Sequence, residues 1–239
     1  MTVGRAIRRV IFAGLMILAQ RLWAAEGVPA PSATTSTVAA FAATNLALKP
    51  VGPGIFELGL VRLDQRRRTV RFPAVVNQKE GGLEYLVVAA TGKTHESLLR
   101  TEARPQDIQL AFLLLGAKGA GTNGWPEDPA KTLPGDPVEI ELSWKEDGIE
   151  KHRAAEEFVL DLKTGAAAKR GPWTYNGSRF REDGFAAQLD GSIISLIADA
   201  DALVNNPRPG REDDDRWQVR KAGLPPVHSP VEVSIRLSQ

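Results

Sequence analysis

A short stretch of the chain brings several reactive groups together within one turn of backbone. After Gly92, five consecutive residues supply an ammonium group, an imidazole, a carboxylate and two hydroxyls: Lys93, Thr94, His95, Glu96 and Ser97. A run typical of a strand precedes the stretch, and a run typical of a helix follows it. Because the free N–H groups at a helix start bind anions and polar ligands, these five residues form the first candidate binding site.

The catalytic motifs that this stretch partly resembles each lack a required residue. A phosphate-binding loop, G-x-x-x-x-G-K-[ST], needs glycine at position 87, where the chain has Val87. A zinc-binding H-E-x-x-H helix needs a second histidine at position 99, where the chain has Leu99. Ser97 has neither G-x-S-x-G surroundings nor a lysine three positions after it. The sequence therefore assigns no catalytic residue, no metal ligand and no cofactor.

Two non-catalytic interpretations of residues 93–97 stay open. In the first, they only begin a helix, with Thr94 as its N-cap and Glu96 placed favourably beside the helix dipole. In the second, they bind a ligand in a concave pocket with Trp173, Ser178 or Trp125 on its walls. The binding candidates are therefore Lys93, Thr94, His95, Glu96, Ser97, Trp173 and Ser178.

A catalytic interpretation is the alternative. It is a hydrolase-like enzyme, with or without a metal ion, centred on the Lys93–Ser97 segment. Such a site requires distant groups that folding would bring to His95, such as His152, His228 or a loop carboxylate. Because no catalytic set is complete in the sequence, we prefer non-catalytic binding.

Alternation of apolar and polar residues predicts several strands. The clearest half-exposed candidates and the shorter ones lie at residues 138–144, 231–237, 68–72, 158–162 and 173–175. Residues 83–89 are apolar on both faces, which is typical of a central strand. Pro73 favours a strand end or an edge strand, since proline donates no backbone hydrogen bond. Asp147-Gly148 and Asp190-Gly191 are typical of type I′ hairpin turns.

Two short helices are expected between these strands, at about residues 95–102 and 105–115. Pro105 suits the first turn of the second helix, whose apolar residues repeat with helical spacing, and Gly116 can end it. The order of elements is strands, then helices, then strands joined by hairpins. That order predicts an α+β fold, in which a largely antiparallel sheet carries the two helices on one face.

The N-terminal region predicts export. Residues 1–25 contain a basic start, an apolar run of about ten residues and small residues near position 25, as in a secretory signal peptide. Residues 26–50 are rich in Ala, Ser, Thr and Pro, which indicates a flexible linker, and residues 51–239 suit a single domain. We therefore expect a periplasmic or extracellular protein with no stable membrane span after signal cleavage.

Composition excludes several classes of function. Cysteine is absent, so disulfides, thiol catalysis and thiolate-bound iron–sulfur clusters are excluded. Residues 1–25 hold four arginines and no acidic residue, so their removal lowers the formal charge from +1 to −3. The composition of the mature chain therefore gives no electrostatic reason to expect nucleic-acid binding.

Several ordered segments resemble the YdjY-type domain of bacterial secreted proteins. They lie between about residues 65 and 237 and include Phe72–Asn77, Leu83–Val88, Gly92–Leu99, the helix end at Ala111–Gly116, Trp173–Ser178 and Gly191–Leu196. The resemblance implies no established reaction or catalytic residue. Some members have been described as ferredoxin-like, but this chain has no cysteine to bind a cluster. The expected function is an exported, non-catalytic domain that binds a small ligand or a cell-envelope protein.

Overall fold

Strands with alternating side chains dominate the part of the chain that the computed structural model describes, residues 48–238 apart from 122–123, 127 and 129–130. In β4 (Thr69–Val76), β7 (Asp136–Glu146) and β17 (Pro230–Leu237), buried positions alternate with more exposed ones over most of the length. Each strand therefore has a core face and a solvent face. The predicted signal peptide and nearly all of the predicted linker lie outside the described residues.

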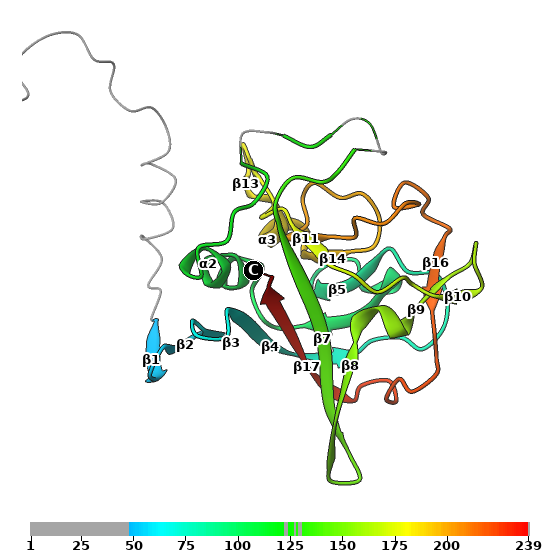
Figure 1. Cartoon of the computed structure of the whole chain (residues 1–239), viewed down its shortest axis with the longest axis horizontal. Coiled ribbons are helices and arrows are strands. Elements are labelled where there is room, and N and C mark those ends of the chain that lie inside the picture. Colours follow the sequence, from blue (N-terminus) through cyan, green and yellow to red (C-terminus); the bar gives the residue numbers. More distant parts are fainter. Residues whose placement is uncertain (1–47, 122–123, 127, 129–130, 239) are drawn as a thin grey trace, which may run out of the picture. The chain divides into compact units, whose positions relative to one another are not determined.

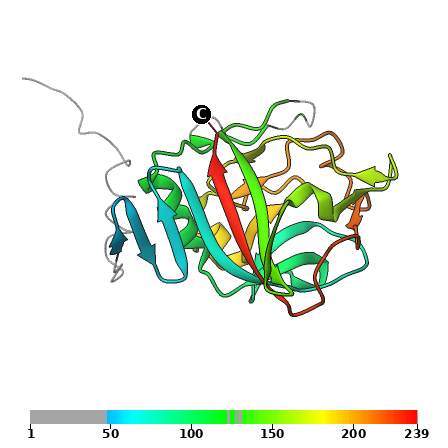
Figure 2. The same ribbon diagram turned by 60° about the horizontal axis from the view of Figure 1, so that its bottom comes forward.

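Eight of these strands close into a barrel. Around the ring the order is β4, β17, β7, β11 (Trp173–Tyr175), β15 (Val204–Asn205), β14 (Ser192–Ser195), β5 (Tyr85–Ala89) and β6 (Ser97–Thr101), and β6 pairs again with β4. The β5–β6 and β14–β15 pairs are parallel, and the other pairs of the ring are antiparallel. Figure 2 shows one wall, in which β17 (red) lies between β4 (cyan) and β7 (green).

The remaining strands extend the barrel sheet or form small sheets. β1 (Lys49–Gly52), β2 (Ile55–Leu58) and β3 (Val61–Asp64) continue the sheet beyond β4, and β8 (Ile149–Ala154) pairs with β7. The small sheets consist of β9 (Val159–Asp161), β10 (Ala166–Ala167) and β16 (Trp217–Val219), and of β12 (Phe180–Arg181) and β13 (Gly184–Phe185). The β7–β8 turn is the predicted Asp147-Gly148 hairpin, with both residues at positive φ.

The helical elements are short. Among the described residues they are α2 (Pro105–Leu114), α3 (Ala186–Asp190) and two 3₁₀ turns, η1 (Thr94–Glu96) and η3 (Ala155–Phe158). α2 confirms the second predicted helix, with Pro105 at its start. It packs beside β3, β4 and α3, as Figure 1 shows, and Phe112 stacks on Tyr175 of β11 with ring centroids 4.5 Å apart.

The predicted α+β fold is wrong. The structure is mostly β, with about 12% helix and a closed barrel in place of an open sheet with helices on one face. The helix expected at residues 95–102 is the single turn η1 followed by the strand β6. Leu98 and Leu99 are both fully buried, because β6 is covered on both faces. A strand buried on both faces shows no alternation, so its sequence is compatible with a helix.

Two smaller expectations are also wrong. Asp190-Gly191 is not a hairpin turn, because Gly191, at φ 73°, ends α3. Pro73 lies in the middle of β4, which is not an edge strand. The carbonyl oxygen of Pro73 accepts a hydrogen bond from Thr101 Oγ1, so its backbone polar groups point away from β17. On the side of β4 away from β17, the neighbouring strand changes from β3 to β6 near Pro73. No neighbouring strand there needs a backbone hydrogen bond from residue 73, so proline, which has no N–H, is tolerated.

The inner faces of the wall strands fill the core. Phe72, Val233 and Leu142 lie in one row across β4, β17 and β7, and all three are buried. The outer faces of the same strands carry polar side chains, among them Arg71, Glu139, Glu141, Ser234 and Arg236, beside a few proline and valine residues. The wall therefore presents a set of side chains to solvent whose positions are fixed by core packing on the other side.

Candidate functional site

Lys93 lies at the centre of the predicted site. Its Nζ donates a hydrogen bond to Tyr85 Oη at 3.0 Å and lies 5.0 Å from the centre of the Tyr85 ring. The same ammonium is 3.8 Å from Glu96 Oε1 and 3.9 Å from Glu84 Oε2. The folded chain thus surrounds Lys93 with partners from β5 and η1, so its charge is already neutralised by the protein.

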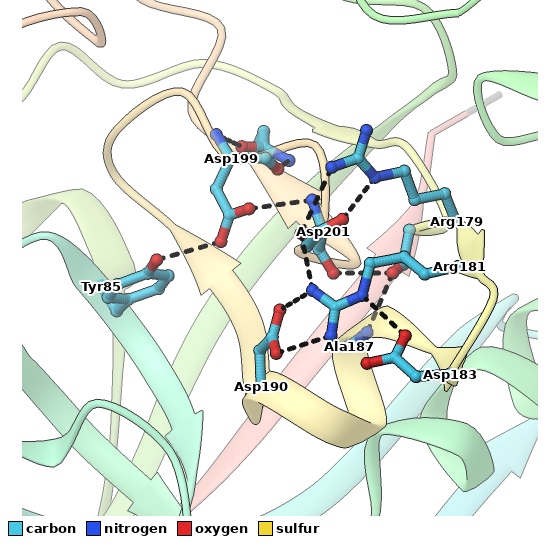
Figure 3. A network of polar contacts seen from close by, with 10 residues as sticks. Tyr85, Arg179, Arg181, Asp183, Ala187, Asp190, Asp199 and Asp201 are labelled. Atoms are coloured by element: carbon cyan, nitrogen blue, oxygen red, sulfur yellow. Dashed lines mark hydrogen bonds and ion pairs between the residues drawn. The ribbon is translucent and has the colours of Figure 1, made fainter.

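A line of hydrogen bonds connects Lys93 to Ser178, 85 positions later in the sequence. Tyr85 donates to Asp199 Oδ2 at 3.0 Å, and Asp199 Oδ1 accepts from the Asp201 N–H at 2.8 Å. Ser178 Oγ donates to the Asp201 carbonyl at 2.6 Å and accepts from the N–H of Ala187 at 3.1 Å. Figure 3 shows most of this network. The structure therefore links two predicted binding residues, Lys93 and Ser178, through hydrogen bonds between groups of the protein itself.

Ion pairs extend the same network beyond Asp201. Arg179 and Arg181 both contact the Asp201 carboxylate, at 2.5 and 3.3 Å. Arg181 also donates two hydrogen bonds to the Asp190 carboxylate, of 2.7 and 2.9 Å, and its Nε lies 3.2 Å from Asp183 (Figure 3). These contacts connect the β12–β13 hairpin and α3 to the loop after β14. They therefore stabilise the arrangement of these elements.

Burial and neighbouring charges shift the pKa values of Lys93 and of the groups around it. Burial, and then the Asp199 carboxylate, raises the pKa of Tyr85 to about 12, so the phenol stays protonated. Burial and the neighbouring Glu96 carboxylate raise the pKa of Glu84. Burial alone would lower the pKa of Lys93, but the bond to Tyr85 and the two glutamates outweigh it and raise that pKa. The Lys93 side chain therefore stays protonated and positively charged.

The other residues of the segment do not converge on a pocket. Ser97 is fully buried, and its Oγ donates to the Leu99 carbonyl at 2.7 Å. The His95 side chain is 79% exposed, and its Nε2 lies 3.5 Å from Glu96 Oε2. Thr94 caps no helix through its side chain; its carbonyl accepts a bond from Asn77 Nδ2 at 2.5 Å. His152 contacts Glu141 and Glu150 instead of His95.

Trp173 is buried and has a supporting position. Its Nε1 donates to Glu156 Oε1 at 3.1 Å, and the Arg208 guanidinium lies over its ring at 4.9 Å. Arg208 Nη2 donates to the same Glu156 oxygen at 2.7 Å. Trp173 is therefore used to hold Glu156, which lines the groove described next.

A groove of about 1130 Å³ lies on the outer side of the barrel wall. Its lining comes from the β3–β4 turn, from β4, β17, β7 and β8, from η3, and from the segment after β10. The charged residues of the lining are Arg66, Arg67, Arg68, Arg71, Arg153, Arg170, Arg236, Glu139, Glu141, Glu156 and Glu157. Seven arginines against four glutamates give the groove an excess of positive charge, although the whole chain is close to neutral.

Strand register places these groups in rows. Arg71, Ser234 and Glu141 are direct neighbours across β4, β17 and β7. In the next row Arg236 lies between Thr69 and Glu139. Neighbouring strands are about 4.8 Å apart, so each row that crosses the strands brings an arginine of β4 or β17 close to a glutamate of β7.

Several of the arginines are incompletely neutralised. Within the described residues, Arg66 and Arg68 have no carboxylate at ion-pair distance. Arg71 Nη1 is 3.8 Å from Glu232, and its buried Nε has no hydrogen-bond partner among those residues. At the other end, Arg153 and Arg170 share Glu157, at 3.8 and 2.5 Å. Both ends of the groove can therefore accept a further anion.

Sequence reasoning missed this groove. The available signal is the run Arg66-Arg67-Arg68 followed by Arg71, which is conspicuous in a chain with balanced charge. The lining residues contributed by the other strands begin at Glu139, 68 positions after Arg71, and only the folded sheet brings them beside the run.

The structure also bears on metal binding and on membrane-spanning helices. Across residues 48–238, in the parts described, no group of three or more His, Asp or Glu side chains could hold a metal ion. In the same residues, no helix has the length and apolar composition needed to cross a membrane.

The fold and the groove define a β-barrel domain with an arginine-lined groove on the outer side of one wall. A family model described as the YdjY domain matches residues 61–236, and the chain belongs to this family. The resemblance inferred from the sequence is thus confirmed, and the YdjY domain is one of unknown function. Neither a curated protein nor a solved structure gives a significant match.

Proposed function

We propose that this chain is an exported, non-catalytic binding domain whose arginine-lined groove takes an anionic small ligand or an anionic partner of the cell envelope. The observation that carries the proposal is the excess of guanidinium groups over carboxylates in one concave surface. Arginine stays protonated, so it is a poor proton acceptor, but its planar fork binds carboxylate and phosphate groups in two-bond geometry. The N-terminal sequence supports export.

The Lys93–Ser97 segment is a weaker candidate for the ligand site. Its cation is paired with Glu84, Glu96 and Tyr85, and its serine hydroxyl is buried in the barrel wall. Nothing in this geometry favours the hydrolase-like alternative over binding.

The test compares two triple variants of the full-length chain. Arg66→Gln/Arg68→Gln/Arg71→Gln removes three charges from the groove, and Lys118→Gln/Lys145→Gln/Lys163→Gln removes three from exposed lysines outside it. Dextran sulfate, a flexible polyanion, is the probe in isothermal titration. We expect the arginine variant to bind about tenfold more weakly and the lysine variant to bind nearly as well as wild type. Equal weakening in both variants, or no binding by wild type, contradicts the proposal.

A further inference from the structure

We infer that the groove recognises an acidic polysaccharide, a chain of sugar units that carry carboxylates separated by free hydroxyls. The inference rests on the proposed function above and narrows it to one class of ligand. Three observations lead to it: the length of the groove, the acidic groups in its middle, and the absence of Phe, Tyr and Trp from its lining.

The groove is long enough to favour a polymer over a single small anion. It crosses from the β3–β4 turn over β4, β17 and β7 to β8, which is at least three strand spacings, or about 14 Å. Arg66 and Arg68 lie at one end, and Arg153 and Arg170 lie at the other. One small anion cannot contact both ends, whereas a chain with repeated anionic groups can.

The middle of the groove contains acceptors. Glu139 and Glu141 lie on the solvent face of β7, and their side chains are 57% and 53% exposed. Glu139 pairs with Arg236 and Glu141 with His152, but a carboxylate accepts up to about four hydrogen bonds, so both retain acceptor capacity. A ligand with hydroxyl donors between its anionic groups satisfies these glutamates. A chain with a phosphate or sulfate at every unit places negative charge against them.

Other polymers fit the lining less well. The groove residues include no Phe, Tyr or Trp, so unpaired nucleic-acid bases would find no large aromatic ring to stack on. A peptide could not add as a strand at the groove floor, because β17 and β7 each already have neighbours on both sides. Arginine forks bind the carboxylates of uronic acids well, and Ser234 and Thr69 add hydroxyls to the lining.

The experiment compares probes on the full-length chain. Polygalacturonate is the carboxylated polysaccharide; dextran sulfate, polyphosphate, poly-glutamate and neutral dextran are the alternatives. We expect polygalacturonate to bind more tightly than polyphosphate or poly-glutamate of equal charge, and neutral dextran not to bind. Binding of dextran sulfate that depends on Arg66, Arg68 and Arg71, without binding of polygalacturonate, overturns this inference and leaves the proposed function standing. If neither probe binds, both fail.

A variant of the groove glutamates should change the binding of polygalacturonate and of polyphosphate in opposite directions. Glu139→Gln/Glu141→Gln replaces carboxylate acceptors by weaker amide acceptors and removes two negative charges. We expect polygalacturonate to bind about two- to fivefold more weakly and polyphosphate to bind more tightly. Glu141→Gln alone is the second variant, because it leaves the Glu139–Arg236 pair intact. Tighter binding of polygalacturonate by either variant contradicts the acceptor role.

Discussion

Ser97 shows how a reactive side chain is used for structure. Its hydroxyl donates to the carbonyl of Leu99 two residues later, inside a strand that is covered on both faces. Lys93 is similar, since its ammonium neutralises Glu84 and Glu96 and bonds to a tyrosine whose hydroxyl continues toward Asp199. At the scale of single residues, chemical type alone therefore does not distinguish a binding group from a structural one.

Replacement of Ser97 tests this assignment. Ser97→Ala removes one buried hydrogen bond, so the free energy of unfolding should fall by about 1 kcal/mol, measured by urea denaturation. Dextran sulfate binding should not change, because Ser97 does not line the groove. A fluorophosphonate should leave wild type unlabelled. Labelling at Ser97 that disappears in the variant would instead support the hydrolase-like interpretation.

Glu84 makes a prediction about pH. Its pKa in the folded protein is raised above the usual 4.5, first by burial and then by the Glu96 carboxylate, so its ionisation opposes folding as the pH rises. Glu84→Gln removes that opposition. The variant should gain stability over wild type at pH 7, and the gain should disappear below pH 4.5.

Urea denaturation at several pH values measures this difference. The control is Glu102→Gln, which removes a carboxylate that is 74% exposed. A gain in Glu84→Gln that does not depend on pH would show that the effect is not electrostatic.

At the scale of elements, local pattern predicted those parts of the chain in which one face meets water. β7 and β17 show clear alternation, and α2 has a proline at its start and apolar residues at helical spacing. β6 was mistaken for a helix because both its faces are buried. Its position next to β5 was also hidden, since parallel neighbours usually require a connection of a dozen or more residues, and only residues 90–96 separate these two.

The short connection between β5 and β6 depends on close packing of two glycines. A Cβ on Gly191 would lie 2.7 Å from the Gly92 Cα, and Gly191 has φ 73°. Gly191→Ala should therefore lower the free energy of unfolding by about 2 kcal/mol or more, from backbone strain and the clash together.

Gly223 provides the matched control for this substitution. It has a similar φ of 75°, but a Cβ there would meet nothing within 4 Å. Gly223→Ala should cost only the backbone strain, about 1 kcal/mol. Equal losses in the two variants would mean that the contact between Gly92 and Gly191 contributes little.

At the scale of the whole molecule, the barrel depends on a narrow seam. β4 and β6 share only two register pairs, Val75 with Arg100 and Val76 with Leu99. Thr101 strengthens the seam, because its Oγ1 donates to the Pro73 carbonyl and accepts from the Ala103 N–H at 3.0 Å. Closure of this kind joins residues 23 to 25 positions apart and leaves no local signature.

Thr101→Val keeps the shape of the side chain and removes both hydrogen bonds. We expect a loss of about 1–3 kcal/mol in the free energy of unfolding, because the buried Ala103 N–H loses its partner. Hydrogen exchange should become faster at Ala103 and at Asn77, whose N–H bonds to Leu98 across the seam. Thr164→Val, in an exposed turn, is the control and should change neither measurement.

The sequence could not place the groove, because its lining is assembled only when strands from distant parts of the chain pair. Each arginine in it looks, within its own strand or turn, like an ordinary solvated residue. Arg71 and Arg236 become neighbours of Ser234 and Glu139 through register between strands from opposite ends of the domain. Family membership, by contrast, was readable from short ordered segments without knowledge of the fold.

The alternation of β17 also limits how this protein can evolve. Ser234 and Arg236 line the groove, while Val233 and Ile235 between them belong to the core. Substitutions at the outward positions can change the ligand preference without disturbing the interior. A one-residue insertion or deletion in this strand would exchange the two sets and destroy core and groove together. Length variation among family members should therefore fall in the turns, and ligand preference should diverge by point substitution alone.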